Sequence, residues 1–260
     1  MDVLLTNDDG IDADGLHALY DALAALDGVF VTVVAPATDQ SAVGRAMSHE
    51  VDVSTHELGY VVEGTPTDCV VAAVGAMGLS PDIVVSGCNR GANLGEYVLG
   101  RSGTVSAAVE AAFFDIPSIA VSLYVPVAED IDFSDYEPDG GAYVEAARAT
   151  QYLVEHAVDA GVFEQADYLN VNCPVPDGDP TPMEVTRPSH AYDMDAKREG
   201  DTVHIRDRIW KRMAEGDIPD SEGTDRRAVV DGRISVSPLT APHTTEHHEA
   251  LDGLVAGFDG

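Results

Sequence analysis

The chain has 260 residues, 45% of them hydrophobic, and its 46 Asp and Glu residues outnumber its 14 Lys and Arg residues, giving a net charge of −32 at pH 7. This apolar content is enough for a folded core and argues against a disordered polyacid. The charge argues against general affinity for duplex nucleic acid or for anionic membranes. It is typical of a halophile protein, because concentrated salt screens the repulsion among surface carboxylates.

Neither the cysteines nor the N-terminal residues indicate export. The three cysteines, Cys69, Cys88 and Cys173, include no Cys-x-x-Cys pair, which argues against a disulfide framework and against a zinc site. No basic segment precedes an apolar stretch at the N-terminus, and the apolar runs reach only about six residues, far short of the roughly 20 that span a bilayer. We therefore expect a cytoplasmic protein that makes no membrane contact.

Apolar runs and amphipathic segments alternate along the chain. A strand is predicted over 3–6, followed by a helix over 14–26 whose leucines recur at helical spacing. Further strands are predicted over 30–35, 51–53, 60–62, 83–86, 117–123 and 168–172. Further helices are predicted to end near 77 and 114 and to cover 141–157 and 244–255. Thr65 is a suitable N-cap for the helix ending near 77, and Ser102 or Thr104 for the one ending near 114.

Strands that alternate with helices indicate parallel βαβ units. We predict an α/β fold with a doubly wound, Rossmann-like, mostly parallel sheet between two layers of helices. From 174 to 238 turn residues dominate and helix signals are weak, so we expect β-hairpins that project from the core. The predicted division is an α/β catalytic core over 1–173 and C-terminal hairpins with a final helix over 174–260, acting as a single functional unit.

Polar segments follow several of the predicted strands or begin a helix. They are Asn7-Asp8-Asp9, Gln40-Ser41, the glycine-rich segment 86–95, and Ser102-Gly103-Thr104. The carboxyl ends of parallel strands meet at one edge of a sheet, so these segments are expected to converge there. Carboxylate, hydroxyl and amide oxygens are the ligands that Mg²⁺, Mn²⁺ and Ca²⁺ prefer.

The glycine-rich segment and the helix start suit an anion. The segment 86–95 is neither a dinucleotide fingerprint nor a P-loop, but its glycines allow backbone N–H groups to approach a phosphate. The helix start at Ser102 adds hydroxyls, free amides and the positive end of the helix dipole. Ordinary N-capping is the alternative role for Ser102 and Thr104.

Several longer stretches carry a resemblance to a known family. They are LLTNDDGIDADGL (4–16), VVAPATDQSA (33–42), GTPTDCV (64–70), PDIVVSGCNRGANLGE (81–96), SGTVSAAVEA (102–111), IPSIAVSL (116–123) and GTDRRAVVDGRISVSPL (223–239). Together they resemble the SurE family of stationary-phase survival 5′/3′-nucleotidases, nearly from end to end. The resemblance implies hydrolysis of nucleoside 5′-monophosphates to nucleoside and phosphate, with 3′-monophosphates as a further substrate class.

The resemblance also implies roles for individual residues. One divalent cation, Mg²⁺ or Mn²⁺, would be held by Asp8, Asp9, Ser41 and Asn89. The substrate phosphate would be bound by Asn93, Ser102, Gly103 and Thr104, and Asn7 would orient the two carboxylates. Members of the family form dimers or tetramers by exchanging C-terminal segments, so a homodimer or homotetramer is expected here.

The chain departs from the family pattern in two places. Arg101 stands before Ser-Gly-Thr where the family usually has a tyrosine. The loop after the second strand reads Thr38-Asp39-Gln40-Ser41-Ala42, with an acidic residue where the family often has a basic one. These changes bear on base preference and phosphate affinity and leave the implied metal ligands intact.

The residues favour metal-assisted hydrolysis of a phosphate ester, in which a cation polarises a phosphoryl oxygen and positions a water. Asp8 or Asp9, whichever is less tied to the cation, would orient or deprotonate that water. Ser102, Thr104 and nearby amides would stabilise the equatorial oxygens.

Other functions fit part of the pattern. An aspartyl-phosphate mechanism uses Asp-x-Asp after the first strand, whereas Asp8 and Asp9 are adjacent. A serine acyl hydrolase would need Gly-x-Ser-x-Gly and a histidine partner, which the loop serines lack. A non-catalytic nucleotide- or metal-binding regulatory module would use the same ligands as the enzyme, and metal-dependent turnover separates the two.

The charge of −32 leads to a first prediction. Raising KCl from about 0.2 M to about 3 M should raise the melting temperature, because the screening length falls to roughly 3 Å at 1 M salt. Thermal unfolding followed by circular dichroism across this range measures the effect. A melting temperature that stays flat would contradict salt-dependent folding.

Overall fold

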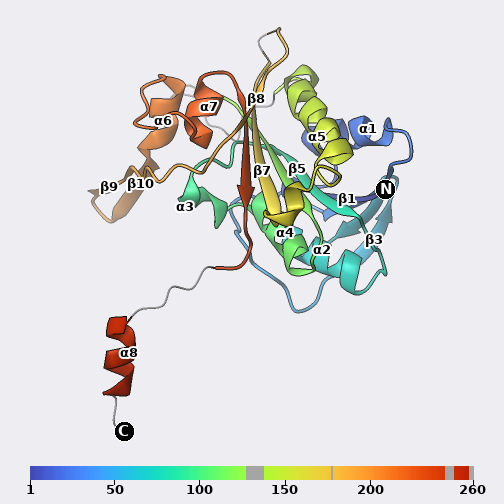
Figure 1. Cartoon of the computed structure of the whole chain (residues 1–260), viewed down its shortest axis with the longest axis horizontal. Helices are drawn as coiled ribbons and strands as arrows, with labels where there is room; N and C mark the ends of the chain where they lie inside the picture. The colour runs from blue at the N-terminus through green and yellow to red at the C-terminus, as the bar shows by residue number, and fades with distance from the viewer. Residues whose placement is uncertain (127–137, 177, 244–248, 258–260) are drawn as a thin grey trace.

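The computed structural model describes residues 1–126, 138–176, 178–243 and 249–257. A nine-stranded sheet in the order β3-β4-β2-β1-β5-β6-β7-β11-β8 crosses the molecule, with helices on both faces (Figure 1). Its strands are β1 (Asp2–Thr6), β2 (Phe30–Pro36), β3 (Val53–His56), β4 (Gly59–Val62), β5 (Ile83–Arg90), β6 (Ser118–Tyr124), β7 (Tyr168–Pro174), β8 (Met183–Val185) and β11 (Ile234–Leu239). The sheet is parallel from β4 through β7, while β3 is antiparallel to β4 and β11 to β7. The predicted α/β fold with a mostly parallel sheet is confirmed.

The described residues form eight α-helices, four of which cover the faces of the sheet (Figure 1). They are α1 (Asp14–Ala24), α2 (Pro66–Gly75), α3 (Glu96–Leu99), α4 (Gly103–Phe113), α5 (Val144–His156), α6 (Arg208–Ala214), α7 (Asp225–Val230) and α8 (Glu249–Ala256), with 3₁₀ turns at Gly140–Tyr143 and Val162–Glu164. The pair α1 and α5 covers one face, and the pair α2 and α4 covers the other (Figure 1). In β1 the side chains alternate, so that Val3 and Leu5 pack in the first layer and Leu4 in the second.

The predicted caps of two helices can be compared with the structure. Thr65 caps α2 in a capping box: its hydroxyl accepts from the Asp68 N–H at 3.2 Å, and its own N–H donates to the Asp68 carboxylate at 2.8 Å. Ser102 caps α4 by accepting from the Val105 N–H at 3.0 Å. Thr104 lies inside that helix, which leaves its hydroxyl available for another contact.

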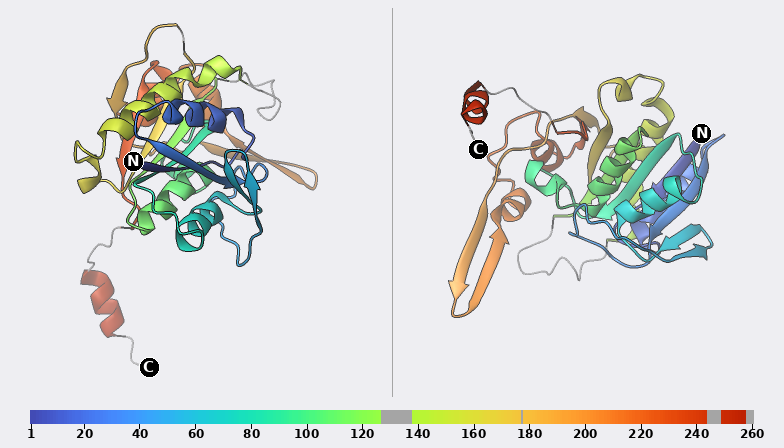
Figure 2. Two further views of the ribbon diagram at one scale, coloured as in Figure 1. Left: turned by 90° about the vertical axis from the view of Figure 1, so that its right-hand side faces the viewer. Right: turned by 90° about the horizontal axis from the view of Figure 1, so that it is seen from below.

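The region 174–238 differs from its prediction. One projecting hairpin is present, formed by β9 (Met194–Glu199) and β10 (Thr202–Asp207) (Figure 2). The helices α6 and α7 were not expected, because elements of six or seven residues are too short for their periodicity to stand out. β11 does not project but pairs with β7 inside the main sheet.

Two further predictions concern the C-terminal part. The boundary after residue 173 stays a prediction, although β8 and β11, which follow it, belong to the main sheet. The final helix is present as α8, and 244–248, where it was expected to begin, lie outside the described residues. Within the described ranges, no helix has the length and apolar character needed to cross a membrane.

A glycine on α1 brings this helix close to the strand that carries the site. A Cβ added at Gly15 would lie 2.0 Å from the carbonyl oxygen of Cys88 in β5. Gly15→Ala should therefore lower the free energy of unfolding by about 1–3 kcal/mol, the usual cost of overpacking. Gly75→Ala, at the end of α2 with nothing within 4 Å of the added Cβ, is the matched control. Urea unfolding in concentrated KCl measures both, and an equal effect of the two changes would contradict this packing.

Candidate active site

Loops from several strands meet at the carboxyl ends of β1 and β5. The connection after β1 runs through α1 to β2 on one side, and the connection after the neighbouring β5 runs through α4 to β6 on the other side, so a crevice opens between them at this switch point. A pocket of about 330 Å³ is found there. Most of the predicted site residues line it, namely Asp8, Asp9, Ser41, Asn89, Asn93 and Ser102. The expected convergence of the four polar segments at this edge of the sheet is therefore observed.

Asp8 is the most buried carboxylate of the pocket and is held by α4. Its side chain is 3% exposed, and the Thr104 hydroxyl donates to it at 2.5 Å. A Cβ at Gly103 would lie 2.7 Å from the Asp8 Cβ, so glycine permits the approach. The Asp8 carbonyl also accepts from the Gln40 N–H at 2.7 Å, which ties the loop after β2 to β1.

Asp9 faces the end of β5, and the Arg90 N–H donates to its carboxylate at 2.8 Å. Burial and the charge of Asp9 raise the pKa of Asp8 to about 7, although the bonds from Thr104 lower it. Burial and the charge of Asp39 likewise raise the pKa of Asp9. Two adjacent carboxylates that are both difficult to ionise define a place where added positive charge is favoured.

Ser41 and Asn89 bring neutral oxygens to the same pocket. The Ser41 N–H donates to Asp39 at 2.7 Å, which fixes the turn that carries the serine hydroxyl. The Asn89 side-chain nitrogen donates to the Gly91 carbonyl at 2.5 Å, so its amide oxygen is the atom left for a ligand. Among the described residues no three His, Cys, Asp or Glu side chains gather as a metal site, so a cation here would also need these neutral oxygens.

A group of buried asparagines supports the pocket from behind. The Asn93 N–H donates to the Asn172 side chain at 2.7 Å, and the Asn93 carbonyl accepts from Asn170 at 2.8 Å. The Asn93 side-chain amide donates to Ser122 at 2.9 Å and reaches the Thr104 hydroxyl at 3.5 Å. The loop after β5 is thereby bound to β6, β7 and α4.

The remaining predicted residues, Asn7, Gly103 and Thr104, are not among the residues that line the pocket. Asn7 is buried, and its amide donates to the Gly10 carbonyl at 2.7 Å, which shapes the turn after β1. Gly103 and Thr104 position Asp8, as described above.

Asp39, Arg90 and Arg101 also line the pocket; the sequence marked Arg101 and the acidic loop of Asp39 only as departures from the family pattern and gave no role to Arg90. Asp39 and Arg90 lie inside the stretches already singled out, and Arg101 directly precedes one of them. Their closeness in sequence to the predicted site residues was the available signal. Sequence spacing alone does not show which side chains point into the pocket.

The fold and the pocket define a class of protein: a doubly wound α/β protein with paired carboxylates, hydroxyl groups and a helix N-terminus at its switch point. The family described as survival protein SurE matches residues 3–195, and the chain belongs to that family.

Relatives and a solved structure agree with this assignment. The chain is 66% identical to the 5′-nucleotidase SurE of Haloarcula marismortui over 257 residues, covering 99% of this chain and 95% of the relative. It is also 66% identical to the 5′-nucleotidase SurE of Natronomonas pharaonis, covering 99% of this chain and 100% of the relative. The crystal structure of the SurE protein from Aquifex aeolicus gives a TM-score of 0.76 at 33% identity, covering 94% of this chain and 95% of that chain. The family resemblance is confirmed, and the first two organisms are halophilic archaea, as the charge led us to expect.

Proposed function

We propose that this protein is a metal-dependent 5′-nucleotidase that hydrolyses nucleoside 5′-monophosphates to nucleoside and phosphate. The observation that carries the proposal is the meeting of Asp8, Asp9, Ser41 and Asn89 in one pocket with the N-terminal end of α4. The oxygens suit a hard cation, and the helix end suits a phosphate. The names of the relatives in Haloarcula marismortui and Natronomonas pharaonis support the same reaction.

One Mg²⁺ or Mn²⁺ ion would be held by Asp8, Asp9, Ser41 and Asn89. The donor set fits such an ion, because the raised pKa values of Asp8 and Asp9 reflect carboxylates that gain from added positive charge. When bound, the ion supplies polarisation of a phosphoryl oxygen and acidification of a water.

The protein's own residues would divide the remaining tasks. Asp8 is held by Thr104, whereas Asp9 is more exposed, so Asp9 is the carboxylate that would orient the attacking water or accept its proton. The Ser102 hydroxyl would donate to a phosphoryl oxygen, whereas the Asn93 side-chain amide donates to Ser122 and reaches Thr104 and would support the pocket wall. Asn93 reaches the Thr104 hydroxyl, and Thr104 donates to Asp8. The wall that would bind the phosphate is therefore linked to Asp8 by hydrogen bonds.

The reaction can be tested with one variant and a matched control. In about 3 M KCl, phosphate release from nucleoside 5′- and 3′-monophosphates should require Mg²⁺ or Mn²⁺ and stop with excess EDTA. Asp9→Asn should lower kcat by about 10²-fold or more, the typical contribution of a positioned base. Asp12→Asn removes the same charge from a side chain in the same loop that is 85% exposed, and should keep its activity.

The outcomes separate the alternatives. Folded, Mn²⁺-loaded protein that releases no phosphate from any monoester would favour the non-catalytic regulatory module. Turnover that persists in EDTA would contradict the cation. Melting curves of both variants show whether a lost activity reflects a lost fold.

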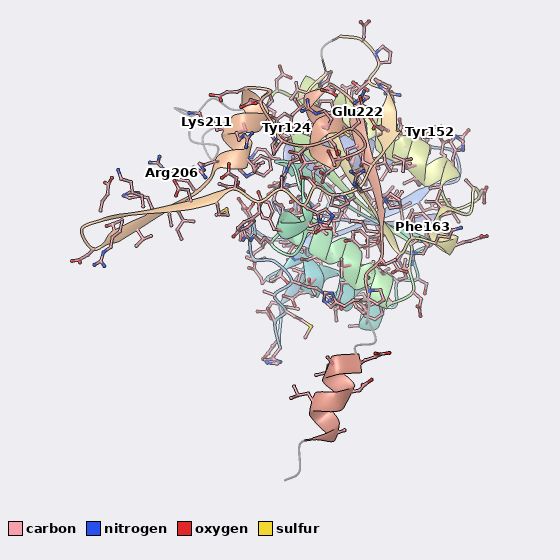
Figure 3. The ribbon with its side chains drawn as sticks, turned by 60° about the vertical axis from the view of Figure 1, so that its left-hand side comes forward. Tyr124, Tyr152, Phe163, Arg206, Lys211 and Glu222 are labelled. Atoms are coloured by element: carbon pink, nitrogen blue, oxygen red, sulfur yellow. The ribbon has the colours of Figure 1, made fainter. Side chains whose placement is uncertain are left out.

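We also propose that the protein forms a homodimer or homotetramer through the β9–β10 hairpin. This hairpin extends from the body as a separate two-stranded sheet, an arrangement of marginal stability by itself (Figure 2). Val203 and Ile205 on β10 are 53% and 69% exposed. The segment 194–212 carries six of the fourteen Lys and Arg residues, including Arg206 and Lys211 (Figure 3), against four Asp and Glu residues. Five of these six basic side chains already pair with carboxylates of the same chain, so contact with a second copy would rest on the apolar Val203 and Ile205.

Light scattering after size exclusion in concentrated KCl tests the assembly. The double variant Val203→Asp, Ile205→Asp should run as a monomer, because it places charge in the proposed apolar contact. Tyr152→Asp, an exposed aromatic on α5, is the control and should leave the assembly intact (Figure 3). Wild-type protein that is monomeric at micromolar concentration would contradict the proposal.

A further inference from the structure

An arginine lies at the edge of the pocket, supported by an aromatic ring. Arg101 is exposed and lines the pocket between α3 and the N-cap of α4. Its guanidinium carbon lies 5.2 Å from the centroid of the Tyr97 ring, within the range of a cation–π contact. The ion pairs observed among the described residues do not include Arg101, in a chain with 46 Asp and Glu residues. The side chain is therefore held by the ring and not by a carboxylate.

The Tyr97 ring is itself held from several directions. The guanidinium carbon of the fully buried Arg226 lies 5.3 Å from its centroid. A Cβ at Gly95 would lie 2.1 Å from Arg226, so a glycine is needed for that side chain to reach the ring. The Tyr97 hydroxyl donates to Asp207 at the start of α6. Arg101 thus rests on a support fixed by the C-terminal part of the chain.

A second aromatic side chain completes this arrangement. Tyr192 meets Tyr97 edge to face with their centroids 5.1 Å apart, yet it is 62% exposed. We call Tyr97, Arg101 and Tyr192 the pocket-edge shelf. An exposed planar cation backed by an aromatic ring is a surface that suits a flat, aromatic ligand.

We propose that Arg101 stacks on the nucleobase of the substrate, with Tyr97 as the residue that positions it and Tyr192 packed against Tyr97. The inference rests on the proposed function, since the phosphate would lie at Asp8, Asp9 and Ser102. The ribose of a nucleotide separates base from phosphate, so the base would leave the pocket at its edge, where Arg101 lies. Arginine planes stack on bases in this manner, and every base offers a π-face. The substrate class is thus nucleotides with any base, in preference to sugar phosphates without one.

Variants at position 101 separate stacking from simple charge. The equilibrium readout is the binding of adenosine by calorimetry, which needs neither turnover nor a cation. The kinetic readout is kcat/KM for AMP against ribose 5-phosphate, which lacks the base. Arg101→Ala should weaken adenosine binding about three- to thirtyfold, the range of a cation–π contact, and lower kcat/KM for AMP alone. Arg187→Ala, which removes an exposed arginine outside the pocket, is the control for net charge.

Two further substitutions of Arg101 distinguish stacking from charge. Arg101→Lys keeps the charge without the plane and should behave like Arg101→Ala, whereas Arg101→Tyr restores a stacking face and should bind adenosine nearly as the wild type does. If Arg101→Lys kept the wild-type kcat/KM for AMP, or if Arg101→Ala lowered kcat/KM equally for AMP and ribose 5-phosphate, Arg101 would be assigned to the phosphate and the inference would be overturned. Unchanged adenosine binding in Arg101→Ala would overturn it as well. Protein that binds adenosine through Arg101 but hydrolyses no nucleotide would contradict the proposed function and still support the role of the pocket-edge shelf in base binding.

Discussion

The contact between the first turn of α4 and Asp8 is the interaction on which the site depends. Asp8 is almost fully buried beside a second carboxylate, a costly arrangement unless donors reach it. Gly103 allows the helix to come close, and the Thr104 hydroxyl supplies the hydrogen bond. A bond of this kind to a charged group is worth about 1.5–3 kcal/mol. The same contact draws Ser102, the cap of α4, to the pocket wall, so a structural bond and a ligand-binding surface share one origin.

Rigidity of the pocket comes from buried amides behind it. Asn170 and Asn172 on β7 and Ser122 on β6 bind the backbone and side chain of Asn93. Buried polar groups that satisfy one another specify a single arrangement more sharply than apolar packing does. The loop after β5 is therefore part of the sheet's framework, although it also carries residues that line the pocket.

Charge acts on two scales in this protein. A net charge of −32 repels an anionic substrate at long range, but molar salt shortens that repulsion to roughly 3 Å. In the proposed function, recognition would then depend on groups in direct contact: a cation at the paired carboxylates, the end of α4, and the guanidinium of Arg101. The β9–β10 hairpin carries three basic and four acidic residues, so the proposed assembly would depend on its exposed Val203 and Ile205 more than on charge. An acidic surface and a local affinity for phosphate are therefore compatible.

The sequence alone determined the features that local signals encode. Apolar runs marked β1, β2, β5 and β6, and the N-cap at Thr65 marked the start of α2. The rule that parallel strands end at one edge predicted that the segments of Asp8, Asp9, Ser41 and Asn89 converge. Only the tertiary structure decided that β11 joins the main sheet, that Thr104 serves Asp8, and that Arg226 supports Tyr97 beneath Arg101. Periodicity and capping act over a few neighbouring residues, so they can be read along the chain. Contacts such as Thr104 with Asp8 join residues 96 positions apart, and they exist only once the layers have packed.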